Sequence, residues 1–66
     1  MPADDSHWPE ILTVAQVAEW LQVNPYTVRE EARRGHLPGR KVGREWRFSR
    51  AAILAWLHGD PPETLR

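Results

Sequence analysis

Apolar residues between positions 13 and 22 recur at the spacing of an amphipathic helix. Four of them lie three or four positions apart and would share one helix face: Val14, Val17, Ala18 and Leu21. Thr13 and Gln16 form a capping box in front of them, in which each side chain can bond a free backbone N–H of the first turn. The pattern predicts a helix over residues 14–21.

A second helix is predicted over residues 25–34. Asn24 is a favoured N-cap, and Pro25 suits the first helical position because its missing N–H costs nothing there. Gly35 can take the left-handed conformation that ends a helix. The apolar residues expected to face the core are Val28 and Ala32. Only three residues separate the two helices, so they must cross steeply, as in a helix-turn-helix.

The pattern then changes to short extended segments. Residues 40–42 and 46–48 flank the sequence Gly43-Arg44-Glu45, which is typical of a β-hairpin with a glycine-containing loop. Lys41 and Arg47 would point outward, because successive side chains of a strand alternate between its faces. The inner face would hold Val42, Trp46 and Phe48.

Ser49 is the predicted N-cap of a third helix, which ends at Gly59. Its apolar face would consist of Ile53, Trp56 and Leu57. The chain is therefore expected to be mostly α with a small β-hairpin, a winged helix-turn-helix of three short helices and a two-stranded wing. We expect a flexible arm (residues 1–10), this domain (11–59) and a tail (60–66).

Charge is distributed unevenly, although the formal net charge is zero. Residues 1–28 hold four acidic residues and no Lys or Arg. Residues 29–50 hold eight Lys and Arg residues against three glutamates, a net charge of +5. A basic segment of this kind attracts polyanions. The competing interpretation is a solvated basic surface that has no partner.

The outer face of the second helix carries groups that can read DNA. Arginine can bond guanine through two N–H groups, and glutamate can accept from the cytosine amino group. The first turn can also direct backbone N–H groups at a phosphate. The residues predicted to contact DNA from this helix are Pro25, Tyr26, Thr27, Arg29, Glu30 and Arg33. The alternative is a salt-bridged surface in which Glu30 pairs with Arg34.

Four cations crowd onto residues 39–48, which is electrostatically unfavourable unless an anion compensates them. The predicted DNA contacts from this wing are Arg40, Lys41, Arg44 and Arg47. Such a wing can lie along the DNA backbone or enter the minor groove, where narrow A·T tracts attract arginine. The alternative is an edge hairpin that its charge keeps soluble.

The stretch from Leu12 to Leu57 resembles the excisionase-family helix-turn-helix module, which is similar to the winged helix of MerR-type regulators. The matching features are LTVAQVAEWLQVNPYTVRE, Gly35, Leu37-Pro38, GRKVGREWRF and the closing AWL, in the family's order and spacing. The resemblance implies sequence-specific binding to double-stranded DNA. It also implies a role as a recombination directionality factor or a small transcription regulator, acting with further copies on adjacent sites or with a recombinase or regulatory partner.

The chain departs from the family pattern at three places. Gln22 stands at the turn, where glycine is common, and a left-handed conformation there would cost about 1–2 kcal/mol. Arg29 and Glu31 replace aromatic and apolar residues, and Glu31 could pair with a wing arginine. Glu30 stands where a basic residue is common, so we expect it to read a base or to serve as an intramolecular partner.

Other classes of function have little support in the sequence. Ser49 is explained as a cap, and three glycines are interpreted as turn residues: Gly35, Gly39 and Gly43. The histidines lack ligand spacing, so we expect no metal. No histidine or carboxylate is placed to activate Ser49, so we expect no enzymatic activity, and we also expect no cofactor and no small-molecule effector. No apolar run approaches the ~18 residues that span a bilayer, and cysteine is absent. We therefore expect no membrane partner and a cytoplasmic protein.

The rival hypothesis is a protein-interaction adaptor that uses exposed tryptophans and arginines. Four tryptophans are many for a short chain, and exposed tryptophans often anchor interfaces: Trp8, Trp20, Trp46 and Trp56. The interpretation we prefer is that Trp46 and Trp56 form most of the small core.

Overall fold

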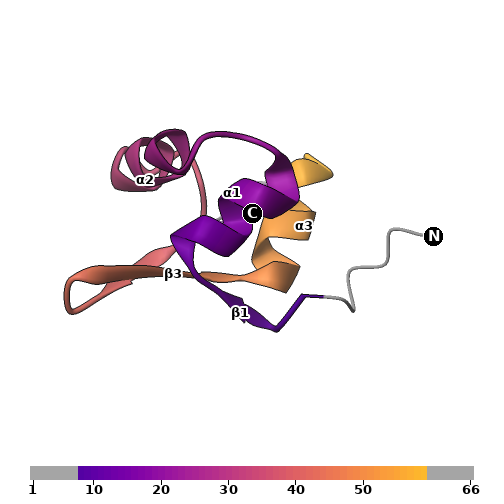
Figure 1. Cartoon of the computed structure of the whole chain (residues 1–66). Coiled ribbons are helices and arrows are strands. Elements are labelled where there is room, and N and C mark those ends of the chain that lie inside the picture. Colours follow the sequence, from indigo (N-terminus) through magenta and orange to yellow (C-terminus); the bar gives the residue numbers. More distant parts are fainter. Residues whose placement is uncertain (1–7, 60–66) are drawn as a thin grey trace, which may run out of the picture.

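The computed structural model describes residues 8–59. Its helices are α1 (Val14–Leu21), α2 (Pro25–Arg33) and α3 (Arg50–Leu57), and its strands are β1 (Ile11–Leu12), β2 (Arg40–Val42) and β3 (Glu45–Ser49). This arrangement confirms the winged helix-turn-helix predicted from the sequence, with one additional strand (Figure 1). The predicted tail and residues 1–7 of the predicted arm lie outside the described residues.

Each helix begins at the cap that the sequence predicts. At α1, the Thr13 hydroxyl accepts from the Gln16 N–H at 3.2 Å, and the Gln16 amide oxygen accepts from the Thr13 N–H at 2.9 Å. The Asn24 side chain accepts from the Tyr26 N–H at 2.7 Å in front of α2. The Ser49 hydroxyl caps α3 in the same way. These bonds satisfy backbone donors that the first turn of a helix leaves free.

The turn between α1 and α2 depends on a strained residue. Gln22 has φ 59° and ψ 47°, the left-handed conformation that glycine usually supplies. Its N–H donates to the Glu19 carbonyl at 3.3 Å, and the Val23 N–H donates to the Ala18 carbonyl at 2.9 Å. This pair of bonds is a Schellman motif, which closes α1 and turns the chain toward α2 within three residues.

The sheet is antiparallel and has the order β1-β3-β2. Leu12 of β1 lies opposite Phe48 of β3, and Lys41 of β2 lies opposite Trp46 of β3. The pairing continues past the strands, because the Arg50 N–H donates to the Glu10 carbonyl at 2.9 Å. The hairpin is therefore anchored to the segment that immediately precedes α1.

The core has a different centre from the one expected. The fully buried side chains of greatest volume are Phe48, Leu12, Ile53, Val17 and Val28, and the core is completed by Ala18, Ala32 and Leu37. Trp46 and Trp56 are only half-buried against this cluster, so the prediction that they form most of it is wrong. Val42 is 62% exposed and does not share the inner face with Phe48.

Trp8, placed in the predicted arm, packs against the domain. Its ring centroid lies 6.5 Å from that of Trp20 on α1. Its carbonyl accepts a hydrogen bond from the guanidinium of Arg50, at the start of α3. The residues before β1 are thus joined to both α1 and α3.

Gly39 is required for close packing and not for a turn, because it lacks a positive φ. A Cβ atom at this position would lie 2.5 Å from Cε2 of the buried Phe48 ring. We expect Gly39→Ala to lower the free energy of unfolding by about 1–3 kcal/mol, since the core must shift to admit the methyl group. Urea unfolding measures this effect. The loss should shrink in a Phe48→Leu background, and an equal loss in both backgrounds would contradict the assigned contact.

Gln22→Gly is expected to stabilise the domain by about 0.5–1 kcal/mol. The substitution removes a left-handed penalty of about 1–2 kcal/mol, and the greater chain entropy of unfolded glycine offsets part of that gain. Thermal and urea unfolding check the sign. Gln22→Ala is the matched control, because it keeps a Cβ in the same conformation and should not stabilise. If both variants stabilise equally, backbone strain at Gln22 is not the cause.

Candidate nucleic-acid interface

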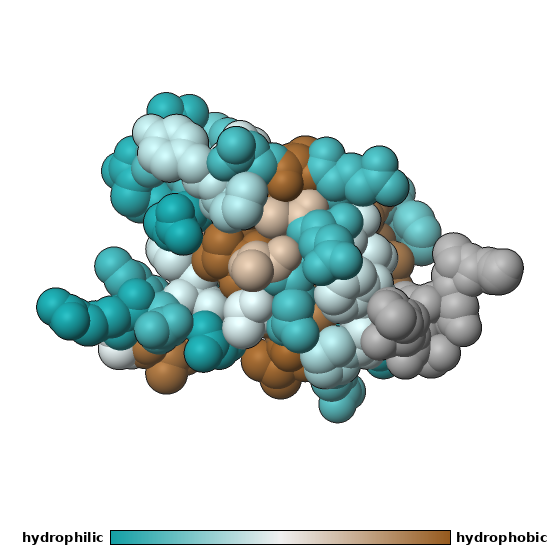
Figure 2. All heavy atoms as spheres, viewed as in Figure 1, coloured by the Kyte–Doolittle hydropathy of each residue, from teal (hydrophilic) through white to brown (hydrophobic). Residues whose placement is uncertain are grey.

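The helix α2 and the β2–β3 hairpin project on the same side of the molecule (Figure 1). In the space-filling view, hydrophilic residues cover both projections, and more apolar residues lie in the recess between them (Figure 2). A pocket of about 320 Å³ lies here, where the start of α1 meets the hairpin. Its lining residues are Thr13, Val14, Ala15, Arg29, Lys41, Arg44, Glu45, Trp46 and Arg47.

This pocket brings together cations that the sequence places in two separate elements. Arg29 comes from α2, whereas Lys41, Arg44 and Arg47 come from the hairpin. Within residues 8–59, Arg29, Lys41 and Arg44 form no ion pair. Their positive charge is therefore only partly compensated within the domain, by Glu30 beside Arg29 and by Glu45 in the pocket lining, and it is accessible to an anion.

Arg47 is positioned differently from the other pocket cations. It is half-buried, and its Nη1 donates to the Trp46 carbonyl at 2.8 Å. The same nitrogen lies 3.6 Å from Oε1 of Glu45. The expected outward orientation therefore holds only in part, because these contacts hold the guanidinium against its own strand.

Arg40, the fourth predicted wing contact, is exposed but does not line the pocket. It pairs in register with Arg47, and both line a second pocket of about 320 Å³ beside Pro38 and Ser49. The two pockets share Arg47. The structure thus separates Arg40 from Arg29, while it brings Lys41 and Arg44 close to Arg29.

The predicted contact residues of α2 are accessible. Val28 and Ala32 are buried, which turns the opposite side of the helix to solvent. Tyr26 is 65% exposed, and the other exposed members of the predicted set are Pro25, Thr27, Arg29 and Arg33. Glu30 is intermediate, with 22% of its side chain exposed. Contact of these six residues with DNA stays a prediction.

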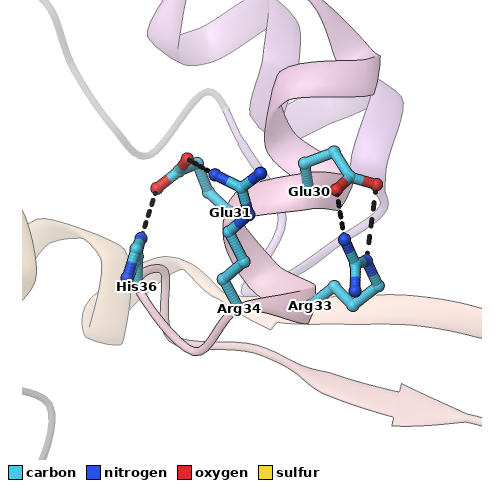
Figure 3. A network of polar contacts seen from close by, with 5 residues as sticks. All are labelled: Glu30, Glu31, Arg33, Arg34 and His36. Carbon is cyan, nitrogen blue, oxygen red and sulfur yellow. Dashed lines mark hydrogen bonds and ion pairs between the residues drawn. The ribbon is translucent and has the colours of Figure 1, made fainter.

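Glu30 is an intramolecular partner of Arg33, not of Arg34 (Figure 3). Arg33 Nη2 donates to Glu30 Oε1 at 2.6 Å, and Arg33 Nε donates to Oε2 at 3.4 Å. The hydrogen bond from Arg33 lowers the pKa of Glu30, and although desolvation opposes this shift, the charges of Arg33, Arg34 and Arg29 reinforce it. The same bond raises the pKa of Arg33.

Glu31 pairs at the end of α2 and not with a wing arginine. Its Oε1 lies 3.0 Å from Nδ1 of His36, and its Oε2 lies 4.0 Å from Nη1 of Arg34 (Figure 3). The reason is the chain reversal after α2, in which Gly35 has φ 81°. The His36 N–H donates to the Glu31 carbonyl at 2.9 Å, which brings the two side chains together.

Metal-binding clusters and membrane-spanning helices are both absent from the part of the chain that the structure describes. No group of three or more His, Cys, Asp or Glu side chains there could hold a metal ion. None of its helices is both long enough and apolar enough to cross a bilayer.

Comparison with known proteins identifies the fold. Residues 11–60 match the family model of a helix-turn-helix domain, a family associated with excisionase-like DNA-binding modules. The chain belongs to this family. The match extends over the helix-turn-helix, the sheet and α3, and it supports DNA binding through the helix-turn-helix. The family is typically non-enzymatic. No curated protein and no solved structure matched the chain.

In this helix-turn-helix domain, all four tryptophans are half-buried: Trp8, Trp20, Trp46 and Trp56. Trp46 stacks on Phe48 with ring centroids 6.3 Å apart, and Trp8 packs against Trp20. The adaptor hypothesis assumed exposed tryptophans, so it loses its main sequence argument. The tryptophans instead pack around the core and enlarge it, because a chain this short can bury only a small core.

The ion pair on α2 makes a prediction for pH titration. Following the Glu30 carboxyl carbon by NMR should give a midpoint below the ordinary value for glutamate, because Arg33 stabilises the carboxylate. Because the pKa is lowered in the folded state, the pair is intact at neutral pH and is lost as the pH falls through the Glu30 pKa. In the Arg33→Ala variant the midpoint should rise. An unchanged midpoint would show that the pair does not form in solution.

Proposed function

We propose that α2 enters the major groove of double-stranded DNA while the β2–β3 wing contacts the flanking backbone or the adjacent minor groove. The observation that carries this proposal is the pocket in which Arg29 of α2 faces Lys41 and Arg44 of the wing. A phosphate strand lying along this recess would meet cations from both elements. Positive charge concentrated in this way releases counterions from DNA and gives salt-dependent affinity.

The geometry of α2 supports its role as the reading element. The major groove is about 12 Å wide and admits one α-helix. Tyr26 and Arg33 lie on the exposed side of α2, from which they can reach base edges. Thr27 lies in the first turn, where its backbone N–H can bond a phosphate, whereas Pro25 has no N–H and the Tyr26 N–H donates to Asn24. In this proposal the helix supplies sequence preference and the wing supplies most of the electrostatic affinity.

The biological role we propose is that of a recombination directionality factor or a small transcription regulator. The family's association with excisionase-like modules supports the first role. A single module of this size buries about 600–1,000 Å² on DNA. We therefore infer weak binding by one copy, strengthened by further copies on adjacent sites or by a recombinase or regulatory partner. Circularly permuted DNA fragments containing the selected site would test for DNA bending, which an architectural role in recombination requires.

The salt dependence of binding tests the proposed interface. If about four phosphates are neutralised, affinity for duplex DNA should fall about a hundredfold between about 50 and 200 mM salt. Arg44→Ala should weaken binding to all sequences and reduce the salt slope by about one, whereas Arg33→Ala should change the sequence preference. Fluorescence anisotropy and selection from a random duplex pool measure these effects.

Arg34→Ala is the matched control, since it removes one exposed arginine that lines neither basic pocket. It should alter affinity less than Arg44→Ala. The proposal fails if no backbone amide of α2 or of the hairpin shifts in NMR spectra when duplex DNA is added at low salt. Binding to an acidic peptide in place of DNA would instead support the adaptor alternative.

A further inference from the structure

The exposed side of α2, which carries the predicted DNA contacts, contains an acidic residue at a position where a basic residue would increase the affinity for DNA. Glu30 lies one turn from Tyr26 and adjacent in sequence to Arg29, and its carboxylate is directed at Arg33 (Figure 3). A carboxylate on this face repels phosphates, so it opposes binding that depends on charge alone. Any contribution of Glu30 to DNA binding must therefore come through its contact with Arg33 and not through its own charge.

The contact with Glu30 engages only one edge of the Arg33 guanidinium. The bonds use the Nε–H and one N–H of Nη2, at 3.4 and 2.6 Å. A guanidinium has five N–H donors in a rigid plane. Three donors therefore stay free, two on Nη1 and one on Nη2, and together they form the fork that fits the O6 and N7 atoms of guanine. Arg33 is 63% exposed, so this fork is accessible.

We infer that Glu30 is a specificity-determining positioning residue, which orients Arg33 for a two-bond contact with one guanine and disfavours non-specific binding to phosphate. Two effects follow from the same carboxylate. It fixes the guanidinium plane before DNA arrives, so less side-chain freedom is lost on binding. It also compensates the charge of Arg33, so a phosphate gains less from this side chain than from an unpaired arginine, which disfavours sites without the guanine.

The next residue on the helix provides a matched control. Glu31 carries the same charge and also pairs with an arginine, but it points to His36 and Arg34 at the end of α2. Glu30→Ala and Glu31→Ala therefore change the net charge equally and both keep a good helix former. Only the first substitution releases Arg33. Glu30→Gln separates charge from position, because its amide oxygen can still accept from Arg33.

The inference rests on the proposed function, and one experiment tests both. The full chain and the three variants are used to select duplexes from a random pool. Affinities are then measured by anisotropy across a salt series, for the best duplex and for a scrambled duplex of equal composition. Circular dichroism checks that each variant is folded.

We expect Glu30→Ala to reduce the preference for guanine at one position by about tenfold. It should strengthen binding to the scrambled duplex by about threefold or more and steepen its salt slope by about 0.9, as Arg33 gains a phosphate contact. Glu30→Gln should retain more of the guanine preference than Glu30→Ala. Glu31→Ala should leave the preference unchanged.

The possible failures are distinguishable. If the wild-type chain binds no duplex, the proposed function fails. If the wild-type chain binds duplex DNA but shows no guanine preference, or if Glu30→Ala and Glu31→Ala behave alike, DNA binding stands and the role of Glu30 is overturned. A stronger guanine preference in Glu30→Ala would also overturn it, because Arg33 would then read the base better without its partner.

Discussion

The pairing of Leu12 with Phe48 is the contact on which the arrangement of the basic surface depends. Leu12 precedes the cap of α1, Phe48 precedes the cap of α3, and the two side chains are 0% and 1% exposed. A two-stranded hairpin alone is only marginally stable in water. Because β3 pairs with β1 as well as β2, the hairpin is held against the segment that begins α1. Since α1 packs on α2, this pairing also sets the position of Arg29 relative to the hairpin.

Side-chain pairing determines where the charge of the basic segment is available. Its three glutamates each neutralise one nearby arginine, as in Glu30–Arg33, Glu31–Arg34 and Glu45–Arg47. Arg50 donates to the Trp8 carbonyl. The cations of residues 29–50 without an ion pair are Arg29, Arg40, Lys41 and Arg44, and three of these line one pocket. The positive charge without an ion pair is thus concentrated on α2 and the hairpin.

The helices, their caps and the hairpin were predictable because each depends on residues close together in sequence. The capping box of Thr13 and Gln16 is one example. The left-handed conformation at Gln22 was indicated by the family resemblance, because glycine is common at that turn position. Strand β1 was missed because two residues cannot show alternation, and its existence depends on a partner strand far along the chain, in which Phe48 lies opposite Leu12. Phe48 is buried, as the predicted inner face of the hairpin requires. Its place at the centre of the core, the exposure of Val42 and the half-burial of Trp46 depend on how β3 pairs with both neighbouring strands. The partner of Glu31 was also wrong, because a wing arginine competes with a histidine that the end of α2 places nearby.

The contrast between paired and unpaired cations separates two contributions to DNA recognition. An ion pair that solvent can reach, such as Glu30–Arg33, adds little to stability, so the fold does not require it. The same carboxylate reduces the attraction of α2 for a polyanion. Because Glu30 adds little to stability and opposes non-specific affinity, its benefit to a DNA-binding helix is chiefly the orientation that it gives to Arg33 for contact with a DNA base. The unpaired arginines and lysine of the pocket act on every sequence alike, because a phosphate is the same at each position. In this division, the acidic residue on α2 contributes to the discrimination between sequences that a uniformly basic surface lacks.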